Sequence, residues 1–321
     1  MLYSKKISVF GHKLKQIRES NQLSRNEVEL RTGITYETLR RLEKGDYLPQ
    51  IATIEILSKL YKVNLLVLLE KLKMGTDVDE LFLELNNLML CNTDNRTTDL
   101  LGLKERTLYA LQEDHSPDLQ ELLFLIDILL EVNEAQDTGN QACKFSIIQK
   151  IKDGICQFAG QKKSSNIALM SLNRIECHLV FTLSVVLADI GEIEESSALL
   201  ENIIRSLEYP LFNNQHFLFI KSVCNLSYNY HIRDRHQQVI AIVDNAIQVS
   251  LKQHSNFLLY FLYYRLAVSH FTLGNKDTAI EHFTLSALHL KITQNDRLYR
   301  QYCDMTREKY SISLEAFIHS A

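Results

Sequence analysis

The stretch SRNEVELRTGITYETLRRLEKG, residues 24–45, constrains the fold of this chain more than any other feature. Ser24 followed three residues later by Glu27 forms a capping box, which predicts that a helix begins here. Gly33 supplies the left-handed backbone conformation that ends a helix and allows a tight turn. Thr35 can cap a second helix. The apolar residues around that second helix share one face, formed by Ile34, Leu39 and Leu42. The stretch therefore predicts two short helices joined by a glycine turn.

The opposite face of the second helix is polar and largely cationic. A short helix, a tight turn and a second helix of this kind are typical of helix-turn-helix DNA readers, whose second helix enters the major groove. The residues expected to contact DNA are Arg25, Thr35, Tyr36, Glu37, Thr38, Arg40, Arg41 and Lys44. Among them, Tyr36, Glu37 and Arg41 occupy the exposed first and middle turns of the helix and are expected to face base edges.

From about Phe10 to Leu69 the chain resembles the phage-repressor (lambda/434, Xre-like) helix-turn-helix family. The matching residues are Leu23-Ser24, Gly33, Leu39, Leu42, Glu43-Lys44-Gly45 and Pro49. The resemblance implies a five-helix domain in which Arg18, on the first helix, pairs with Glu43. One position departs from the family. Glu29 stands where close helix packing normally uses a small residue, which predicts a rotated or looser second helix.

Composition favours an all-α protein with two domains. Only three prolines and ten glycines occur in 321 residues, and Leu, Ile and Glu are abundant. Charge is uneven, because residues 1–73 hold 14 Lys+Arg and 8 Asp+Glu in a chain whose net charge is −4. A basic domain joined to an acidic body suits a DNA reader. We expect a DNA-binding domain over 1–73, a linker over 74–79 and a repeat domain over 80–321.

Other functional classes lack their motifs. The sequence has no Gly-rich phosphate loop, G-x-S-x-G elbow or H-E-x-x-H motif, so we expect neither an enzyme nor a cofactor. His231, Asp234 and His236 are the one metal-like cluster, and they lack a fourth ligand nearby. The six dispersed cysteines are expected to be small core residues of a cytoplasmic protein. The N-terminus has no signal-peptide core, and no apolar run is long enough to span a membrane.

The second part of the chain contains repeated helical hairpins. Each is arranged around one turn residue: Gly191, Asp234 or Gly274. A large residue followed by a smaller one stands seven or eight positions before each turn, at Leu183/Ser184, Leu226/Ser227 and Leu266/Ala267. This pattern resembles a degenerate tetratricopeptide repeat. Weaker helical segments that extend the stack are Asp79–Leu90, Asp118–Val132 and Ile147–Phe158. The sequence predicts a right-handed superhelical solenoid with a concave groove, and the alternative is an unrepeated helical bundle.

A repressor-type domain followed by such a repeat body looks like the peptide-sensing regulators of Gram-positive bacteria, the Rgg/PlcR/NprR group. The similarity is strongest to the PlcR-like branch over Arg174–Ser250. It implies that the repeat body forms a homodimer and binds a short exported and re-imported signalling peptide in its groove. It also implies that asparagines on the inner helices hold the backbone amides of that peptide.

Asn225 matches such an asparagine position, and Asn229 lies one turn later on the same face. An amide side chain both donates and accepts, which matches one peptide unit. The corresponding positions of the other repeats hold Thr182 and Arg265, so the row of asparagines is incomplete. The further candidates are Lys221 and Arg265 for a carboxylate, and Tyr228 and Tyr264 for an aromatic wall. Alternatively, these asparagines cap or satisfy a neighbour, and the tyrosines belong to the core.

The sequence thus predicts a cytoplasmic, dimeric transcription regulator that binds a palindromic operator and a short signalling peptide. Its two recognition helices must lie about 34–36 Å apart to enter successive major grooves. A ligand that prefers one curvature of the solenoid changes that distance and hence the affinity for DNA. Two alternatives stay open: a phage or mobile-element repressor without a peptide ligand, and a helical-repeat interaction scaffold. The outward Arg40, Arg41 and Lys44 argue against the scaffold.

Overall fold

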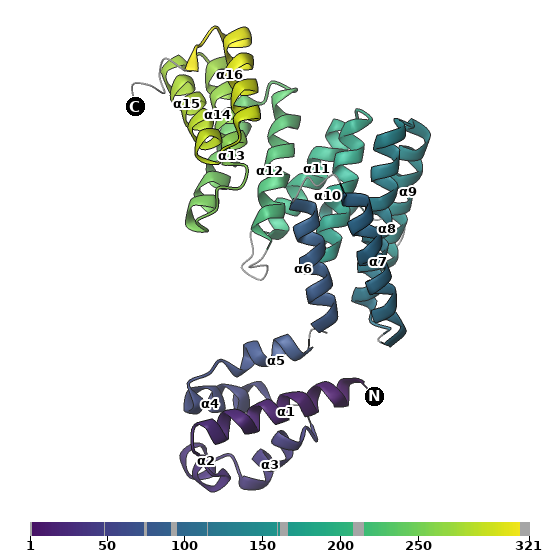
Figure 1. The fold of residues 1–321 in the computed structure, drawn as a ribbon, viewed down its shortest axis with the longest axis vertical. Helices are drawn as coiled ribbons and strands as arrows, with labels where there is room; N and C mark the ends of the chain where they lie inside the picture. The colour runs from purple at the N-terminus through teal and green to yellow at the C-terminus, as the bar shows by residue number, and fades with distance from the viewer. Residues whose placement is uncertain are drawn as a thin grey trace. The chain divides into compact units, whose positions relative to one another are not determined.

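The computed structural model describes residues 2–47, 49–73, 76–90, 95–113, 115–158, 160, 166–207 and 215–314. This described part contains sixteen α-helices, one 3-10 turn and no strand, which confirms the all-α prediction (Figure 1). The chain forms two compact units, Met1–Leu123 and Phe124–Ala321. Across the described ranges, every helix is too short or too polar to cross a membrane.

The first unit begins with the five-helix domain that the sequence predicts. Its helices are α1 (Leu2–Ser20), α2 (Arg25–Thr32), α3 (Tyr36–Lys44), α4 (Ile51–Tyr61) and α5 (Leu65–Lys73). Helix α1 packs against α3 and α5, and α2 packs against α3 and α4. Buried side chains from all five helices form one core, which includes Phe10, Leu14, Val28, Leu39, Leu42, Ile54, Leu57 and Leu65. This apolar core fixes the position of α3, the helix that carries the predicted DNA contacts.

The local signals act as the sequence predicts. The Ser24 hydroxyl accepts the backbone N–H of Glu27 at 3.2 Å, and the Glu27 carboxylate accepts the backbone N–H of Ser24 at 2.7 Å. Gly33 ends α2 with a φ of 75°, a conformation that favours glycine. The Thr35 hydroxyl accepts the backbone N–H of Thr38 and caps α3. The capping hydrogen bonds satisfy backbone donors that would otherwise lack partners at each helix start.

Four longer helices follow. They are α6 (Thr76–Leu90), α7 (Arg96–Glu113), α8 (Pro117–Thr138) and α9 (Gln141–Phe158). Helix α6 begins inside the predicted linker 74–79, whose residues 74 and 75 lie outside the described part. Helix α7 packs against α6 and was not predicted from the sequence. The boundary between the two compact units falls within α8.

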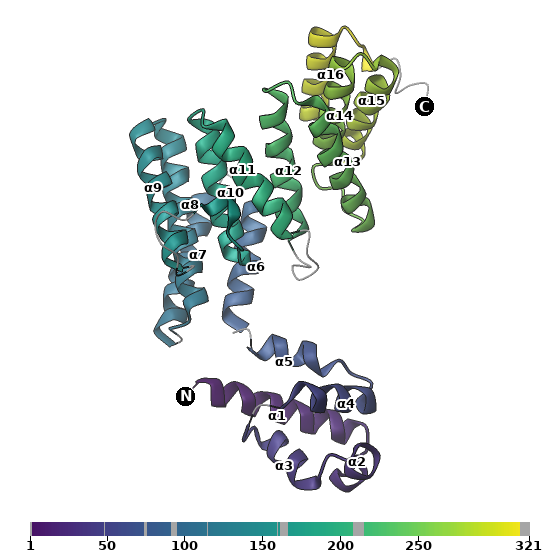
Figure 2. The same cartoon turned by 180° about the vertical axis from the view of Figure 1, so that it is seen from behind.

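Three helical hairpins and a last helix complete the second unit (Figures 1 and 2). Their helices are α10 (Arg174–Asp189), α11 (Ile193–Leu207), α12 (His216–His231), α13 (His236–Lys252), α14 (Leu259–Thr272), α15 (Lys276–Ile292) and α16 (Asp296–Tyr310). Each helix packs against the next, and α12 also packs against both α10 and α14. The first helices of the three hairpins therefore form one continuous row. A 3-10 turn at Ile167–Leu169 packs against α11.

The repeat signature is present in the packing. All three predicted turn residues have a positive φ: Gly191, Asp234 and Gly274. The large and small residues before the turns are buried without exception, at Leu183, Ser184, Leu226, Ser227, Leu266 and Ala267. A small buried residue lets the next helix approach closely, which is how such hairpins stack. The predicted helical-repeat architecture is confirmed.

Candidate functional site

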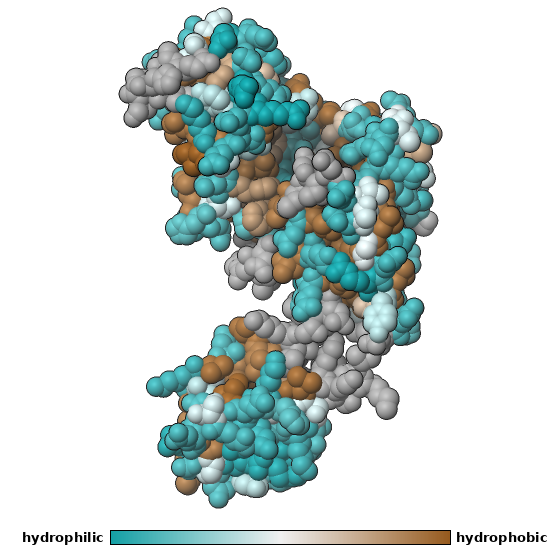
Figure 3. Space-filling model, viewed as in Figure 1, coloured by the Kyte–Doolittle hydropathy of each residue, from teal (hydrophilic) through white to brown (hydrophobic). Residues whose placement is uncertain are grey.

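Helix α3 presents a polar face to solvent. Tyr36, Glu37, Arg41 and Lys44 are exposed, and Arg40 is half-buried. Figure 3 shows that the surface over this helix is mostly hydrophilic. The Glu37 carboxylate accepts two hydrogen bonds from the Arg40 guanidinium, at 2.7 and 2.6 Å. This pairing holds the Arg40 guanidinium against α3. Arg41 and Lys44 lie on the same face, and in the described part no carboxylate lies within 4 Å of either charge.

Arg41 and Arg25 are each placed over an aromatic ring. The Arg41 guanidinium carbon lies 5.1 Å from the ring centroid of Tyr47, and that of Arg25 lies 5.7 Å from Tyr36. A guanidinium over a ring is attracted by the negative face of the π system and loses some of its freedom. The predicted DNA-contact residues therefore come together on one surface. Thr35 and Thr38 share a hydroxyl hydrogen bond of 2.8 Å, and the Thr35 hydroxyl also caps α3.

Glu43 is the buried anchor of this surface. Its carboxylate accepts a hydrogen bond from Arg18 Nε at 2.6 Å and another from Arg25 Nε at 2.9 Å. The hydrogen bond to Glu43 raises the pKa of Arg18, so this guanidinium stays charged although it is buried. Arg18 also donates to the backbone carbonyl of Leu23 at 2.7 Å. The carboxylate thus ties α3 to both α1 and α2, and Arg25 serves it as a second partner that the sequence did not indicate.

The glutamate that departs from the family pattern has a local role. Glu29 is half-buried, and its carboxylate accepts the backbone N–H of Tyr36, the first residue of α3, at 3.0 Å. A carboxylate at a helix N-terminus is favoured by the helix dipole and by the free N–H groups there. The sequence predicted a looser or rotated α2 at this position. The longer side chain adds a hydrogen bond between α2 and the start of α3, and the looser or rotated α2 stays a prediction.

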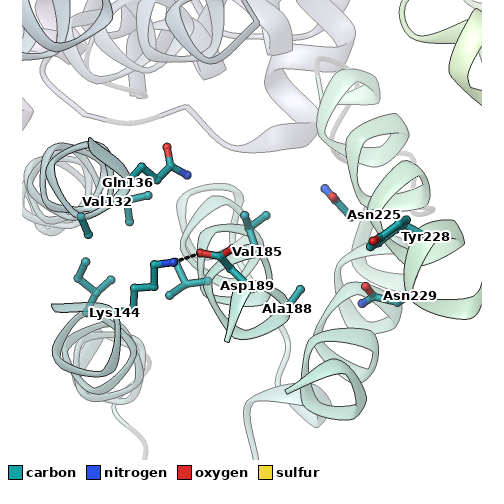
Figure 4. A pocket seen from close by; sticks show the side chains of 12 residues that line it. Val132, Gln136, Lys144, Val185, Ala188, Asp189, Asn225, Tyr228 and Asn229 are labelled. Carbon is teal, nitrogen blue, oxygen red and sulfur yellow. Dashed lines mark hydrogen bonds and ion pairs between the residues drawn. The ribbon is translucent and has the colours of Figure 1, made fainter. Parts of the chain in front are cut away.

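The second candidate site is a pocket of about 540 Å3 in the repeat unit (Figure 4). Four helices line it: α8 with Val132, Ala135 and Gln136; α9 with Lys144 and Ile147; α10 with Val185, Val186, Ala188 and Asp189; and α12 with Asn225, Tyr228 and Asn229. The Lys144 ammonium and the Asp189 carboxylate form an ion pair in its wall. A mixture of aliphatic side chains and a few convergent polar groups is typical of a ligand site.

Three of the predicted peptide contacts lie in this wall. Figure 4 shows Asn225 and Asn229 projecting from α12 toward α10, with Tyr228 between them. Asn229 is only 1% exposed, and its Nδ2 donates to the hydroxyl of Ser196 at 2.9 Å. That hydroxyl donates in turn to the backbone carbonyl of Ser184 at 2.8 Å. Asn225 donates only to the carbonyl of Lys221, at 3.2 Å, and Tyr228 is 48% exposed.

The other three predicted contacts do not line the pocket. Tyr264 lies in a core cluster, 4.6 Å from Tyr302 and 5.3 Å from Phe283 between ring centroids. Only 9% of Tyr264 is exposed, because the core cluster covers its ring, so Tyr264 does not form part of the pocket wall. Lys221 and Arg265 are half-buried and lie beside the pocket rather than in it. The sequence missed Gln136, Lys144 and Asp189, because their partners come from helices distant in the chain.

Buried cysteines and histidines fill out the repeat core. Cys156, Cys177, Cys224 and Cys303 are buried as predicted, whereas Cys143 is exposed at the start of α9, and Cys91 lies outside the described residues. The rings of His231 and His236 lie 5.3 Å apart beside Asp234. Neither this cluster nor any other among the described residues has the geometry of a metal site.

Comparison with known proteins finds one sequence family for the N-terminal helices and several similar solved structures for most of the chain. The family model described as Helix-turn-helix matches residues 14–68. No curated protein matches the chain in sequence. Bacillus thuringiensis PlcR, solved with the peptide PapR7 and DNA, is 15% identical with a TM-score of 0.66, over 92% of this chain and 99% of that one. ComR from S. thermophilus, solved with DNA and its signalling peptide ComS, is 16% identical with a TM-score of 0.58, over 91% and 97%.

A third similar structure is the Streptococcus dysgalactiae SHP pheromone receptor Rgg2, which is 12% identical with a TM-score of 0.56 over 94% of this chain and 99% of that one. The resemblance predicted from the sequence is confirmed at the level of the fold, and PlcR is not singled out among these structures. The proteins of known function among them are DNA-binding regulators and pheromone receptors rather than enzymes. This chain thus contains a helix-turn-helix domain over residues 14–68 and has the fold of PlcR, ComR and Rgg2.

Proposed function

We propose that this chain is a cytoplasmic, sequence-specific transcription regulator whose affinity for DNA is set by a short signalling peptide. In this proposal residues 1–73 bind DNA, residues 74–79 link the two parts, and residues 80–321 bind the peptide and form a homodimer. The observation that carries it is a pocket with aliphatic and polar walls among the repeat helices, in a chain that also has a helix-turn-helix with a cationic face. PlcR and ComR, which share this fold, were both solved with DNA and a peptide.

The recognition helix is α3, which reads the major groove of DNA. Arg41 is exposed near the middle of the helix, and an arginine there can form a bidentate hydrogen-bond pair with guanine. Lys44 lies at the C-terminal end of the helix and suits a phosphate contact. The Glu37–Arg40 pair stands beside them and fixes which polar atoms face the bases.

The peptide lies in the pocket lined by α8, α9, α10 and α12. Asn225 supports this role because its amide makes one hydrogen bond, to a carbonyl of its own helix, and keeps further donor and acceptor capacity. Asn229 is already held by Ser196, so its remaining oxygen is pre-oriented. Tyr228 offers an aromatic surface between the two amides. A peptide unit that meets both amides satisfies groups that would otherwise be buried without partners.

Ligand binding alters DNA affinity through dimer geometry. A peptide held between α8, α9, α10 and α12 favours one arrangement of these helices over another, because it contacts all four. In a dimer, that choice changes the distance between the two recognition helices, which must match successive major grooves.

The DNA part of the proposal is tested by selecting operator sequences from random duplexes with the full chain. Arg41→Ala is expected to weaken binding by about 1–3 kcal/mol and to relax the preference at one guanine. Lys44→Ala is the matched variant, and it should weaken binding to all sequences alike. If Arg41→Ala lowered affinity without changing the preferred sequence, Arg41 would be a phosphate contact.

The peptide part is tested by calorimetric titration with candidate peptides from any short open reading frame beside the gene that encodes a secreted precursor. Asn225→Ala should weaken binding roughly tenfold or more, because a buried ligand amide loses its partner. Asn256→Ala, at an exposed position of the same unit, should leave the affinity unchanged. Equal affinities for wild type and Asn225→Ala would remove Asn225 from the site.

A further inference from the structure

Arg265 has an unusual environment beside the pocket. It lies on α14, and its guanidinium carbon is 4.6 Å from the ring centroid of Phe261 and 5.0 Å from that of Tyr228. Phe261 is one turn earlier on the same helix, whereas Tyr228 comes from α12 and lines the pocket. Two rings therefore hold the guanidinium plane, while its N–H edge stays available for a hydrogen-bond acceptor.

The Arg265 charge lacks a counter-charge in the described part of the chain. Its Nε is excluded from solvent and has no hydrogen-bond partner there, and no Asp or Glu is among the groups that act on its charge. Burial lowers the pKa of Arg265, and the groups that act on it most after burial are the side chains of Tyr302, Cys224 and Tyr228 rather than a carboxylate. A partly buried cation without an anion is costly, so proteins normally pair it.

Other arginines of this chain are paired with a carboxylate. Arg18, Arg40 and Arg233 each lie against a glutamate. Arg235 makes a ring contact like that of Arg265, with its guanidinium 5.9 Å from Tyr230. Arg265 combines the ring contacts with burial and an unsatisfied Nε, which is the state expected of a residue whose anion arrives with a ligand.

The position of Arg265 relates it to the pocket. In the repeat register it occupies on α14 the place that Asn225 occupies on α12. Lys221 lies one turn before Asn225 on α12 and is half-buried. The charges of Arg265 and Lys221 both act on the thiol of Cys224, so both cations lie near the same segment of α12. The polar residues Asn229 and Asn225 are therefore followed by two cations, Lys221 and Arg265.

We propose that Arg265, with Lys221 beside it, forms an anion subsite that binds a carboxylate of the peptide ligand. This inference rests on the proposed function, since it assigns chemistry to one end of the same binding site. A carboxylate matches the planar N–H fork of a guanidinium in two parallel hydrogen bonds. It comes either from the free C-terminus of the peptide or from an Asp or Glu side chain.

Three pools of short synthetic peptides with randomised neutral residues separate these sources. One pool is amidated and has no acidic side chain, one has a free C-terminal carboxylate, and one is amidated and contains a single Asp. Each pool is incubated with the full chain, and retained peptides are quantified by affinity-selection mass spectrometry. Wild type should retain one carboxylate pool roughly tenfold or more above the neutral pool, as charge-assisted hydrogen bonds imply.

Arg265→Met should abolish this preference, and Arg235→Met, which removes another arginine that lies over a tyrosine ring, should preserve it. Arg265→Lys keeps the charge but loses the planar fork, so it should give an intermediate preference and serves as the test if Arg265→Met does not fold.

Equal retention of all three pools by wild type would overturn the anion subsite and leave peptide binding standing. A preference that persists in Arg265→Met would also overturn it. Retention of no pool would overturn the proposed function, and the subsite with it.

Discussion

Two arginines share the single carboxylate of Glu43, which is 3% exposed. The pairing with Arg18 follows from the resemblance to phage repressors. The pairing with Arg25 could not be predicted, because a long, flexible side chain finds its partner only once α2 and α3 are packed. Arg25 also lies over the ring of Tyr36. The buried carboxylate of Glu43 therefore helps to position Tyr36 on the exposed face of α3, because Arg25 contacts both residues.

Replacing Glu43 with alanine leaves two guanidinium groups without their carboxylate. Breaking a buried pair in this way costs about 3–5 kcal/mol. We expect the protected backbone amides of α1 and α3 to exchange with solvent roughly a hundredfold faster or more, measured by hydrogen exchange on the full chain. Glu19→Ala is the control, since Glu19 is exposed and its ion pairs are worth about 1 kcal/mol or less. Equal exchange in Glu43→Ala and Glu19→Ala would contradict this role.

His178 makes the stability of the protein depend on pH. It is 3% exposed on α10, and burial, with the nearby Lys221 charge, lowers its pKa to about 3. An unfolded histidine has a pKa of about 6.5, so between pH 6.5 and 3 the unfolded chain binds a proton that the folded chain does not. Stability therefore falls as pH falls, by about 2 kcal/mol from this residue between pH 7 and 5.

Urea unfolding at the two pH values checks this expectation. His178→Gln should reduce the drop in stability between pH 7 and 5, even if it lowers stability at both. His115→Gln, at an exposed position, controls for the loss of an imidazole. An unchanged drop in His178→Gln would show that His178 does not titrate on unfolding.

At the scale of the element, most of the helices could be read from the sequence. Capping residues and apolar spacing indicated α2, α3 and the three hairpins, because these signals act within one or two turns. Helices α7 and α16 were missed, although Leu100, Leu103 and Ala110 of α7 are buried at helical spacing. Their signal is weaker because polar residues also stand on the buried side, as the fully buried Thr107 and Thr306 show.

The pocket was harder to predict than the helices. Periodicity identifies which face of a helix is buried, but not which helix lies opposite. Asn225 and Asn229 were found because they belong to a repeat, whereas Gln136, Lys144 and Asp189 carry no local pattern. The same limit explains Tyr264, whose spacing is equally compatible with a groove wall and with the core that it joins.

Gly11 sets the distance between α1 and α3. A Cβ atom at this position would lie 2.5 Å from the carbonyl oxygen of Leu42 and 2.6 Å from that of Glu43. Gly11→Ala should therefore force the two helices apart and destabilise the first unit, measured as a lower thermal midpoint for its transition. Gly102→Ala, inside α7 with no atom near the added Cβ, should instead stabilise by about 0.4–1 kcal/mol. If Gly11→Ala and Gly102→Ala changed stability in the same direction, the close approach of α1 to α3 would not explain the effect of Gly11→Ala.

At the scale of the whole molecule, charge is divided between the parts. Residues 1–73 are net basic, whereas the chain as a whole has a net charge of −4. The basic part attracts phosphates, and the acidic remainder discourages binding along DNA by any other surface. One recognition helix reads only a few base pairs, so specific binding is expected to need two copies of the chain.

A dimer makes binding depend on the spacing of the two half-sites. Inserting about five base pairs between the half-sites of the selected operator turns one of them to the opposite face of the duplex. We expect tight binding to be lost in mobility-shift titrations, and a half-site alone to bind as weakly as the altered operator. Unchanged affinity after the insertion would show that each copy binds independently.

Tyr228 is a suitable position for a fluorescent tryptophan that reports on the pocket. The chain has 14 tyrosines and no tryptophan, so an indole introduced at Tyr228 would be the only one in the molecule. Its ring would stand in the pocket wall and under the guanidinium of Arg265, and indole attracts a cation more strongly than phenol does. Light absorbed only by indole would then report on one wall of one pocket. The emission of Tyr228→Trp would shift to shorter wavelength as an arriving ligand displaces water, which makes occupancy visible in a cuvette without labelling either partner.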